Sequence, residues 1–200
     1  LQDESYLGAS QVIIVSASSK TAIGLAQGLA DTNKAPKIIG LTSTKNADFV
    51  NSLDCYDEVI SYDQLSSINS NLKSVMVDMA GSREILGTLH GLLGDNMLKC
   101  FTVGMTHWDN KITAEDALGQ AMLRDRTEFF FAPSHIQKRV KDWGYEGYNQ
   151  KINTFMSSRV IQSKKWMKVK EIVGINIFLP TYNKIVAGDI NPKEGIIVKI

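Results

Sequence analysis

The stretch from Val12 to Ala30 constrains the fold of this chain more than any other part of the sequence. Four consecutive apolar residues, Val12–Val15, pass into a turn of small residues, Ser16–Ser19. Apolar side chains then recur at helical spacing, beginning with Ile23 and Ala26. A buried strand that leads into a helix N-terminus is where α/β proteins hold phosphate groups, because the helix end offers unpaired N–H groups and a partial positive charge. The stretch therefore predicts a phosphate-binding turn.

Strand and helix patterns alternate over the rest of the chain up to Trp143. Strands are predicted at Val12–Ala17, Lys37–Thr42, Glu58–Tyr62, Ser74–Met79, Leu98–Gly104 and Glu128–Ala132. Helices are predicted at Thr21–Thr32, Lys45–Leu53, Ser82–Leu93 and Ser134–Trp143. Strands that are apolar throughout are typical of a parallel sheet covered by helices on both faces. We therefore expect an α/β fold with a Rossmann-like, doubly wound, parallel six-stranded sheet and right-handed crossovers.

Extra C-terminal helices and a terminal strand follow this series. Apolar residues at helical spacing predict an amphipathic helix from Tyr145 to about Gln162. Pro180 suits the first turn of a further helix, and Gly188 suits its end. The tail Ile196–Ile200 has the pattern of a strand, and its context predicts that it pairs with something other than the first six strands.

Composition excludes several classes of protein. The 44% hydrophobic content is too high for a disordered chain, and no stretch approaches the ~20 apolar residues of a membrane span. The first residues are neither basic nor long enough to form a signal peptide. Cys55 and Cys100 form no C-x-x-C motif, so we expect buried free thiols and a cytoplasmic location. The scattered histidines and cysteines have no metal-ligand spacing, so no metal is expected.

Basic residues gather in one region although the net charge is only +1. Nine Lys and Arg residues but only two acids lie between Pro133 and Lys170. A solvated helical face is the simpler interpretation, and a polyanion-binding surface is the alternative. Because no groove-reading motif accompanies the charge, no nucleic-acid partner is expected, and the composition predicts no membrane partner.

The predicted turn lacks two glycines of the dinucleotide-binding fingerprint. Ser19 and Thr21 stand where glycines are expected, and Gly24 alone matches, where it would allow close packing of helix and strand. Hydroxyls at these positions can cap the helix or bind phosphate, and Lys20 can neutralise a pyrophosphate. The alternative is a capped helix without a ligand. The triplet Ser19-Lys20-Thr21 is similar to the end of a P-loop, but the Gly-x-x-x-x-Gly that must precede it is absent, so a P-loop is excluded.

The end of the second strand bears on the choice of cofactor. Dinucleotide sites for NAD place an acid here to bind the ribose hydroxyls. This chain has hydroxyls and a lysine instead, at Ser43 and Lys45. That chemistry suits a 2′-phosphate and favours NADP over NAD. The alternative is that Ser43 caps a helix and Lys45 is solvated.

Residues after the later strands supply candidates for catalysis. Asp78 ends the fourth strand, where a carboxylate acts in catalysis or, more often, bonds to backbone. Gly104 would allow close approach of a flat ring. His107 is the best candidate for proton transfer, with Thr106 as a second donor. The alternative is a histidine on a surface loop beside the packed Trp108.

The segments ASSKTAIGLA, GLTS, CYDEV, DMAG, THW and FFFAP occur in an order that resembles a known family. The chain is similar to the cofactor domain of the medium-chain dehydrogenase/reductase superfamily, on its quinone oxidoreductase side. Within that superfamily it resembles an uncharacterised branch known only as a domain of unknown function. The resemblance runs over nearly the whole chain.

The resemblance implies a role for each matching position. The residues implied to face the pyrophosphate are Ser18, Ser19, Lys20, Thr21 and Ala22. Those implied to meet the 2′-phosphate are Ser43 and Lys45, and Tyr62 matches a tyrosine near the adenosine phosphate. Those implied to border adenine and ribose are Ala80 and Gly81, and those near the nicotinamide are Gly104, Met105 and Thr106.

The resemblance also implies a domain organisation. Relatives carry a barrel-like domain before the first strand, so residues 1–11 are expected to be its remnant or a linker to it. Residues 12–144 form the Rossmann-like cofactor-binding domain. Residues 145–200 form C-terminal helices and a strand that pack on this domain or on the absent one. Phe129–Phe131 matches the edge strand that pairs across the dimer in relatives, which implies a homodimer.

Together these observations predict an NADP(H)-binding domain of a zinc-independent, quinone-reductase-like oxidoreductase. Such an enzyme transfers hydride from the nicotinamide to an unsaturated or carbonyl small-molecule substrate. The alternative is a non-catalytic module that binds a nucleotide or associates with itself through Phe129–Phe131.

Overall fold

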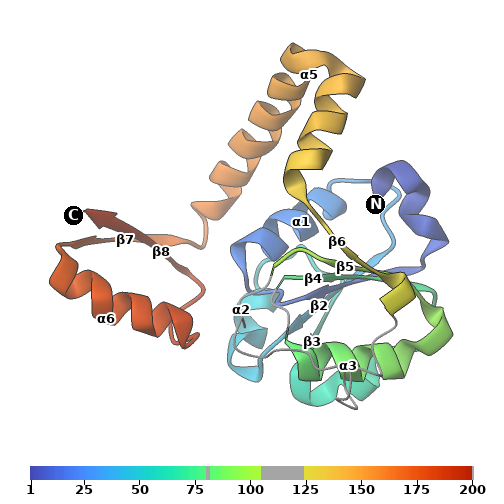
Figure 1. Cartoon of the computed structure of the whole chain (residues 1–200). Helices are drawn as coiled ribbons and strands as arrows, with labels where there is room; N and C mark the ends of the chain where they lie inside the picture. Colours follow the sequence, from blue (N-terminus) through green and yellow to red (C-terminus); the bar gives the residue numbers. More distant parts are fainter. Residues whose placement is uncertain (80–81, 105–123, 200) are drawn as a thin grey trace. The chain divides into compact units, whose positions relative to one another are not determined.

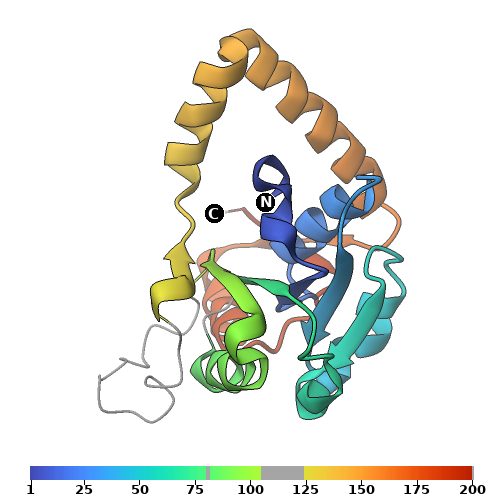
Figure 2. The same ribbon diagram turned by 90° about the vertical axis from the view of Figure 1, so that its right-hand side faces the viewer.

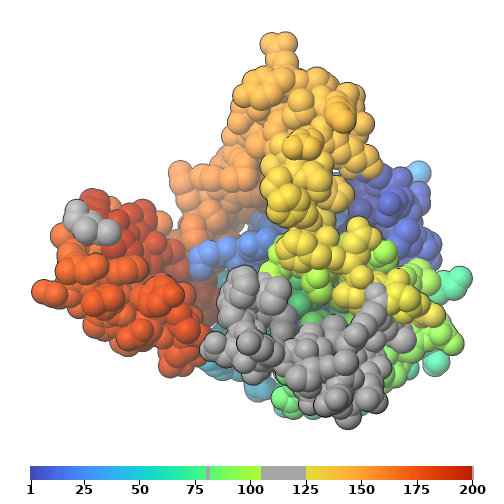
Figure 3. Space-filling model, in the orientation of Figure 1, coloured from blue at the N-terminus to red at the C-terminus, as the bar shows by residue number. Residues whose placement is uncertain are grey.

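The computed structural model of the chain describes residues 1–79, 82–104 and 124–199. Figure 1 and Figure 2 show the ribbon from two sides, and Figure 3 shows the surface. The chain divides into two compact units, Leu1–Ala132 and Pro133–Ile200, which are described separately below. Within the described ranges, no helix is long and apolar enough to span a membrane.

The first unit is built on a six-stranded parallel sheet in the order β3-β2-β1-β4-β5-β6 (Figure 1). Its strands are β1 (Gln11–Val15), β2 (Lys37–Thr42), β3 (Glu58–Ser61), β4 (Ser74–Asp78), β5 (Met97–Thr102) and β6 (Thr127–Phe129). The predicted Rossmann-like sheet is therefore confirmed. The strand order reverses direction between β1 and β4, whose registers place Val15 beside Asp78. Open α/β sheets bind ligands at the carboxyl ends of the strands at such a point.

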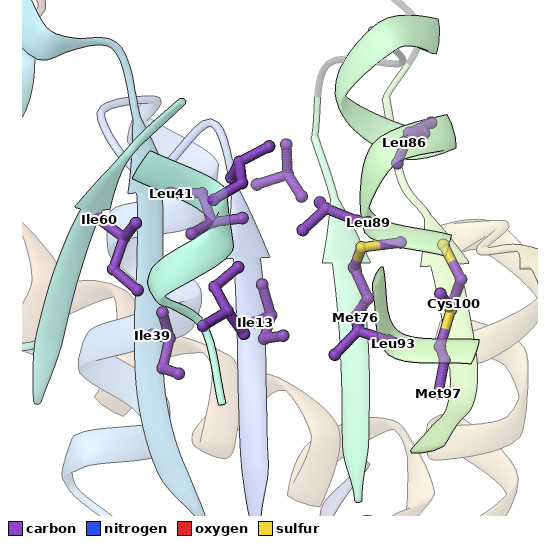
Figure 4. Packing of buried hydrophobic residues seen from close by; sticks show 13 residues of the cluster. Ile13, Ile39, Leu41, Ile60, Met76, Leu86, Leu89, Leu93, Met97 and Cys100 are labelled. Carbon is purple, nitrogen blue, oxygen red and sulfur yellow. The ribbon is translucent and has the colours of Figure 1, made fainter. Parts of the chain in front are cut away.

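Two apolar cores, one on each face, hold the sheet. Alternate residues of β1 point to opposite faces, with Ile13 and Val15 in one core and Val12 and Ile14 in the other. Helix α1 (Lys20–Ala30) covers the face of Val12, and α3 (Arg83–Leu93) covers the opposite face (Figure 1). Figure 4 shows the core that contains Ile13, where leucines of α3 meet residues of the five strands β1 to β5. Burial of these side chains, each worth about 1.5–3 kcal/mol, drives the packing.

Short helical segments complete the first unit. They are the 3-10 segments η1 (Gln2–Gly8), η2 (Thr44–Asn46), η3 (Tyr62–Ser67), η4 (Gly94–Asn96) and η5 (Arg124–Arg126), and the helix α2 (Ala47–Asn51). The helix predicted over Lys45–Leu53 is thus wrong in extent, because it is divided between η2 and α2. The predicted packing role of Gly24 is also wrong: a β-carbon there would meet no atom within 4 Å.

The second unit contains a long helix and a two-stranded parallel sheet. Its elements are α5 (Ala132–Ser163), β7 (Lys168–Val173), α6 (Ile175–Val186) and β8 (Glu194–Lys199). Helix α5 is broken at Gly144, so Figure 1 and Figure 2 both draw two helical arms joined by a bend. The predicted terminal strand is β8, and it pairs with β7 and not with the first six strands. The placement of Pro180 in a first helical turn is wrong, because it lies inside α6.

Candidate nucleotide-binding site

Three loops meet at the carboxyl ends of β1, β2 and β3. The turn Ser16–Ser19 follows β1, the segment Ser43–Asn46 follows β2, and Ser61–Asp63 ends β3 and begins η3. Side chains from the second and third loops bond to the first, as described below. Because the strands are parallel, residues distant in sequence gather at this one edge of the sheet.

The turn after β1 is ordered by its own backbone. The Ser19 amide donates to the Ser16 carbonyl at 2.9 Å, and the Ala17 amide donates to the Leu41 carbonyl at 2.8 Å. Ser16 has a φ of 61°, a left-handed conformation that favours glycine. No hydrogen bond from the amides of Ser18 and Thr21 is found within the described residues. These two amides can therefore donate to a ligand at the N-terminus of α1.

Ser19 caps α1, as predicted from the sequence. Its Oγ accepts from the Ala22 amide at 3.2 Å. The predicted role of Ala22 at the pyrophosphate is not supported, because its side chain is fully buried and its amide is already bound to the Ser19 Oγ. Lys20 and Thr21 are exposed at the start of the helix. The Lys20 and Thr21 side chains therefore lie in the first turn of α1, next to the Ser19 cap.

Tyr62 contacts the turn from one face of the sheet. The Ser16 amide donates to the Tyr62 hydroxyl at 3.1 Å, and the Ser16 Oγ lies 3.3 Å from the same oxygen. Burial raises the pKa of Tyr62, the two hydrogen bonds with Ser16 lower it, and the charge of Asp78 raises it further. The net shift is upward, so the phenol stays protonated at neutral pH.

Tyr56 contacts the same turn and was not singled out by sequence reasoning. Its hydroxyl donates to the Ala17 carbonyl at 2.9 Å. Burial, followed by the charge of Cys55, raises the pKa of Tyr56. A β-carbon at Gly40 would lie 2.8 Å from the Tyr56 ring, so this contact requires a glycine in β2. The sequence signal for this contact was weak, because a single tyrosine before a strand occurs in many different structures.

The loop after β2 is tied to both of its neighbours. The Asn46 amide group donates to the Ser18 Oγ at 3.3 Å, and the Thr44 hydroxyl donates to the Asp63 carboxylate at 2.9 Å. Lys45 is exposed in this loop. Ser43 precedes η2 but makes no side-chain capping bond, so the capping alternative for this residue is not supported.

Asp63 is a second residue that the sequence analysis missed. The sequence suggested that the end of β2 has no acid, yet η3 brings the Asp63 carboxylate to Thr44. Hydrogen bonds from the Ser61 and Thr44 side chains, and then from its own amide, lower the pKa of Asp63. The signal was its position two residues after the end of β3, the strand next to β2 in the sheet.

Asp78 and Gly104 lie at the ends of β4 and β5. Asp78 is fully buried. Burial and then the charge of Asp78 raise the pKa of the Cys100 thiol to about 12, against a smaller lowering by a hydrogen bond with Thr127. Gly104 lies against the backbone of Met79, whose carbonyl carbon would be 3.1 Å from an added β-carbon. The close approach of the Met79 backbone therefore explains why glycine is required at position 104, and the flat ring of a ligand is not needed for that explanation. The predicted positions Ala80, Gly81, Met105, Thr106 and His107 lie outside the described residues.

The fold and this edge of the sheet define a Rossmann-like domain with a capped helix at its switch point. Residues 1–191 match the family described as "Protein of unknown function (DUF2855)". The chain therefore belongs to this family. A comparison with curated proteins finds no match.

Solved structures of oxidoreductases share the fold at low sequence identity. The yhdH oxidoreductase from Salmonella enterica in complex with NADP has a TM-score of 0.58 and 14% identity over 100% of this chain and 57% of that one. The quinone oxidoreductase from Coxiella burnetii has a TM-score of 0.58 and 16% identity, covering 100% and 55%. YHDH of E. coli K-12 with bound NADPH has a TM-score of 0.57 and 13% identity, covering 95% and 54%. The chain thus spans little more than half the length of these proteins.

Proposed function

We propose that the first unit is the NADP(H)-binding domain of a zinc-independent, quinone-reductase-like oxidoreductase. One observation carries the proposal: the loops after β2 and β3 are hydrogen-bonded to the turn after β1, which leads into the capped N-terminus of α1 at the switch point of the sheet. The same fold occurs in oxidoreductases solved with NADP or NADPH. The residues present also fit the group, because hydroxyls, amides and Lys20 at the helix end complement a pyrophosphate.

Each loop would contribute to binding in its own way. The amides of Ser18 and Thr21 would donate to phosphate oxygens, and Lys20 would add a positive charge. Lys45 would meet a 2′-phosphate, with Ser43 beside it. The bound nicotinamide supplies hydride chemistry toward an unsaturated or carbonyl substrate, while the protein binds and orients the cofactor. We assign proton delivery to His107 or Thr106, which follow β5 in the sequence.

Self-association is the second part of the proposal. Strand β6 lies at the edge of the sheet, and Phe129 and Phe131 are 59% and 56% exposed. An exposed apolar edge strand favours pairing with a second copy, because pairing removes its apolar side chains from water. This property is shared with the alternative function, a nucleotide-binding or self-associating module without catalysis.

Titration of the whole chain with NADPH and NADH tests the cofactor assignment. We expect NADPH to bind more tightly, and Lys45→Glu to abolish that preference, because the variant replaces attraction of a 2′-phosphate with repulsion. The matched variant Asp63→Asn removes the carboxylate at Thr44 and should strengthen NADPH binding. Absence of binding of either nucleotide at millimolar concentration would contradict the proposal, and tighter binding of NADH would contradict the role of Lys45.

A further inference from the structure

We propose that Tyr56 and Tyr62 form a tyrosine clamp that fixes the turn Ser16–Ser19 in place of the missing glycines. The clamp is a property of the ligand-free chain. Its consequence for dinucleotide affinity rests on the function proposed above. In this assignment Tyr56 is a positioning residue, because its hydroxyl is occupied by the Ala17 carbonyl and is not directed to a ligand.

The two tyrosines reach the turn from opposite faces of the sheet. Tyr56 precedes β3 and packs against the core of Val12, whereas Tyr62 follows β3 and packs against the core of Ile13. Strand β2 lies between β3 and β1, so each side chain crosses β2 to meet the turn. The turn is thereby held between two phenol groups.

Gly40 makes the path of Tyr56 possible. A β-carbon at this position would lie 2.8 Å from Cδ1 of Tyr56 and 3.0 Å from the β-carbon of Ala17. Both distances are shorter than a van der Waals contact between carbon atoms. Gly40, Tyr56 and Ala17 therefore form one packed unit, in which β2 offers a flat surface for the ring.

The two hydrogen bonds act on adjacent residues of the turn. Ser16 donates its amide to Tyr62, and Ala17 accepts through its carbonyl from Tyr56, so the backbone is held on both sides of the bond that joins them. Ser16 has a φ of 61°, a conformation that costs a serine more than a glycine. The clamp offsets that cost and leaves the following amides oriented for a ligand before it binds.

Amide hydrogen exchange on the full ligand-free chain tests the clamp without any nucleotide. We expect Tyr56→Phe, which removes one oxygen atom, to speed exchange of the Ala17 and Ser19 amides by about tenfold. Exchange in the interior of β4 should not change. The control is Tyr145→Phe, at a residue that is 73% exposed in the second unit. Unchanged exchange at the turn in Tyr56→Phe would overturn the proposal.

A second pair of variants tests the role of Gly40. Gly40→Ala should displace the ring and speed exchange at the same amides, and the double variant with Tyr56→Phe should be no faster than either single variant. If the two substitutions have additive effects on amide exchange, Gly40 and Tyr56 act independently, which would overturn the proposal that Gly40 makes room for the Tyr56 ring. If Gly40→Ala does not fold, Tyr56→Phe alone decides the question.

NADPH titration separates this inference from the proposed function. We expect Tyr56→Phe to weaken NADPH binding by about tenfold, with Tyr145→Phe equal to the natural chain. Faster exchange at the turn in a chain that binds no nucleotide would support the clamp and contradict the proposed function. Faster exchange with unchanged affinity would overturn the link between the turn and the cofactor.

Discussion

At the scale of single residues, glycines at positions 24 and 104 have different physical roles. Gly24 lies in α1 with open space where a β-carbon would be, whereas Gly104 lies against the Met79 carbonyl group. We expect Gly104→Ala to lower the free energy of unfolding by about 1–3 kcal/mol, because backbone must move to admit the methyl group.

The matched variant Gly24→Ala should raise the free energy of unfolding by about 0.5–1 kcal/mol, since alanine has the higher helix propensity. Chemical denaturation of both variants measures these changes. Equal stabilities of the two variants would contradict this assignment of the glycines.

The residues of the candidate site differ in how far the sequence predicts them. Ser19 was predicted as a cap, and it caps α1, because capping depends on residues adjacent in sequence. Tyr56 and Asp63 were missed, because their partners at the turn and at Thr44 lie 39 and 19 residues away. Such contacts depend on which strands become neighbours.

At the scale of elements, the break in α5 decides how the basic region is arranged. Gly144 has φ 69° and ψ 165°, a conformation open almost only to glycine. Arg139 lies one helical turn before Trp143 and is 4.9 Å from the centroid of its ring, and Lys151, beyond the break, is 5.1 Å from the same ring. Part of the basic region is therefore used in cation–π contacts within the unit.

We expect Gly144→Ala to destabilise the second unit by about 1–3 kcal/mol, because alanine strains this backbone conformation. Gly147→Ala is the matched control, since an added β-carbon there would lie 3.4 Å from Trp143. Thermal unfolding of the full chain, followed by circular dichroism, would measure both. Equal stabilities of the Gly144→Ala and Gly147→Ala variants would contradict the view that Gly144 sets the break in α5.

The second unit also shows where prediction of elements fails. Strand β7 was not predicted, because five of its six residues are exposed and it lacks a continuous apolar run. Its pairing with β8 is parallel and follows from the chain passing through α6. Pro180 was expected in the first turn of a helix, where its missing backbone N–H would have no helical partner. It lies instead inside α6, where that N–H would otherwise have formed a helical hydrogen bond.

At the scale of the whole molecule, the edge strand β6 governs self-association in our proposal. We expect the chain to be a dimer in solution and Phe131→Glu to be monomeric, because a buried charge at the paired edge is unfavourable. Sedimentation equilibrium at several concentrations measures this. Ser66→Glu, with the same charge change at an exposed residue of η3, should leave the dimer intact. A dimer that persists in Phe131→Glu would place the interface elsewhere.

By itself, the sequence determined the series of buried strands and flanking helices in the first unit, because apolar runs, helical periodicity and capping are local properties. The same local reasoning predicts a phosphate site at the turn after β1. Only the tertiary structure decided which side chains hold that turn. Tyr56 and Tyr62 reach it across β2, and Asp63 reaches the neighbouring loop, because strand order places β3 beside β2 and β2 beside β1. No local pattern encodes that order, since it results from packing the whole sheet between its two cores.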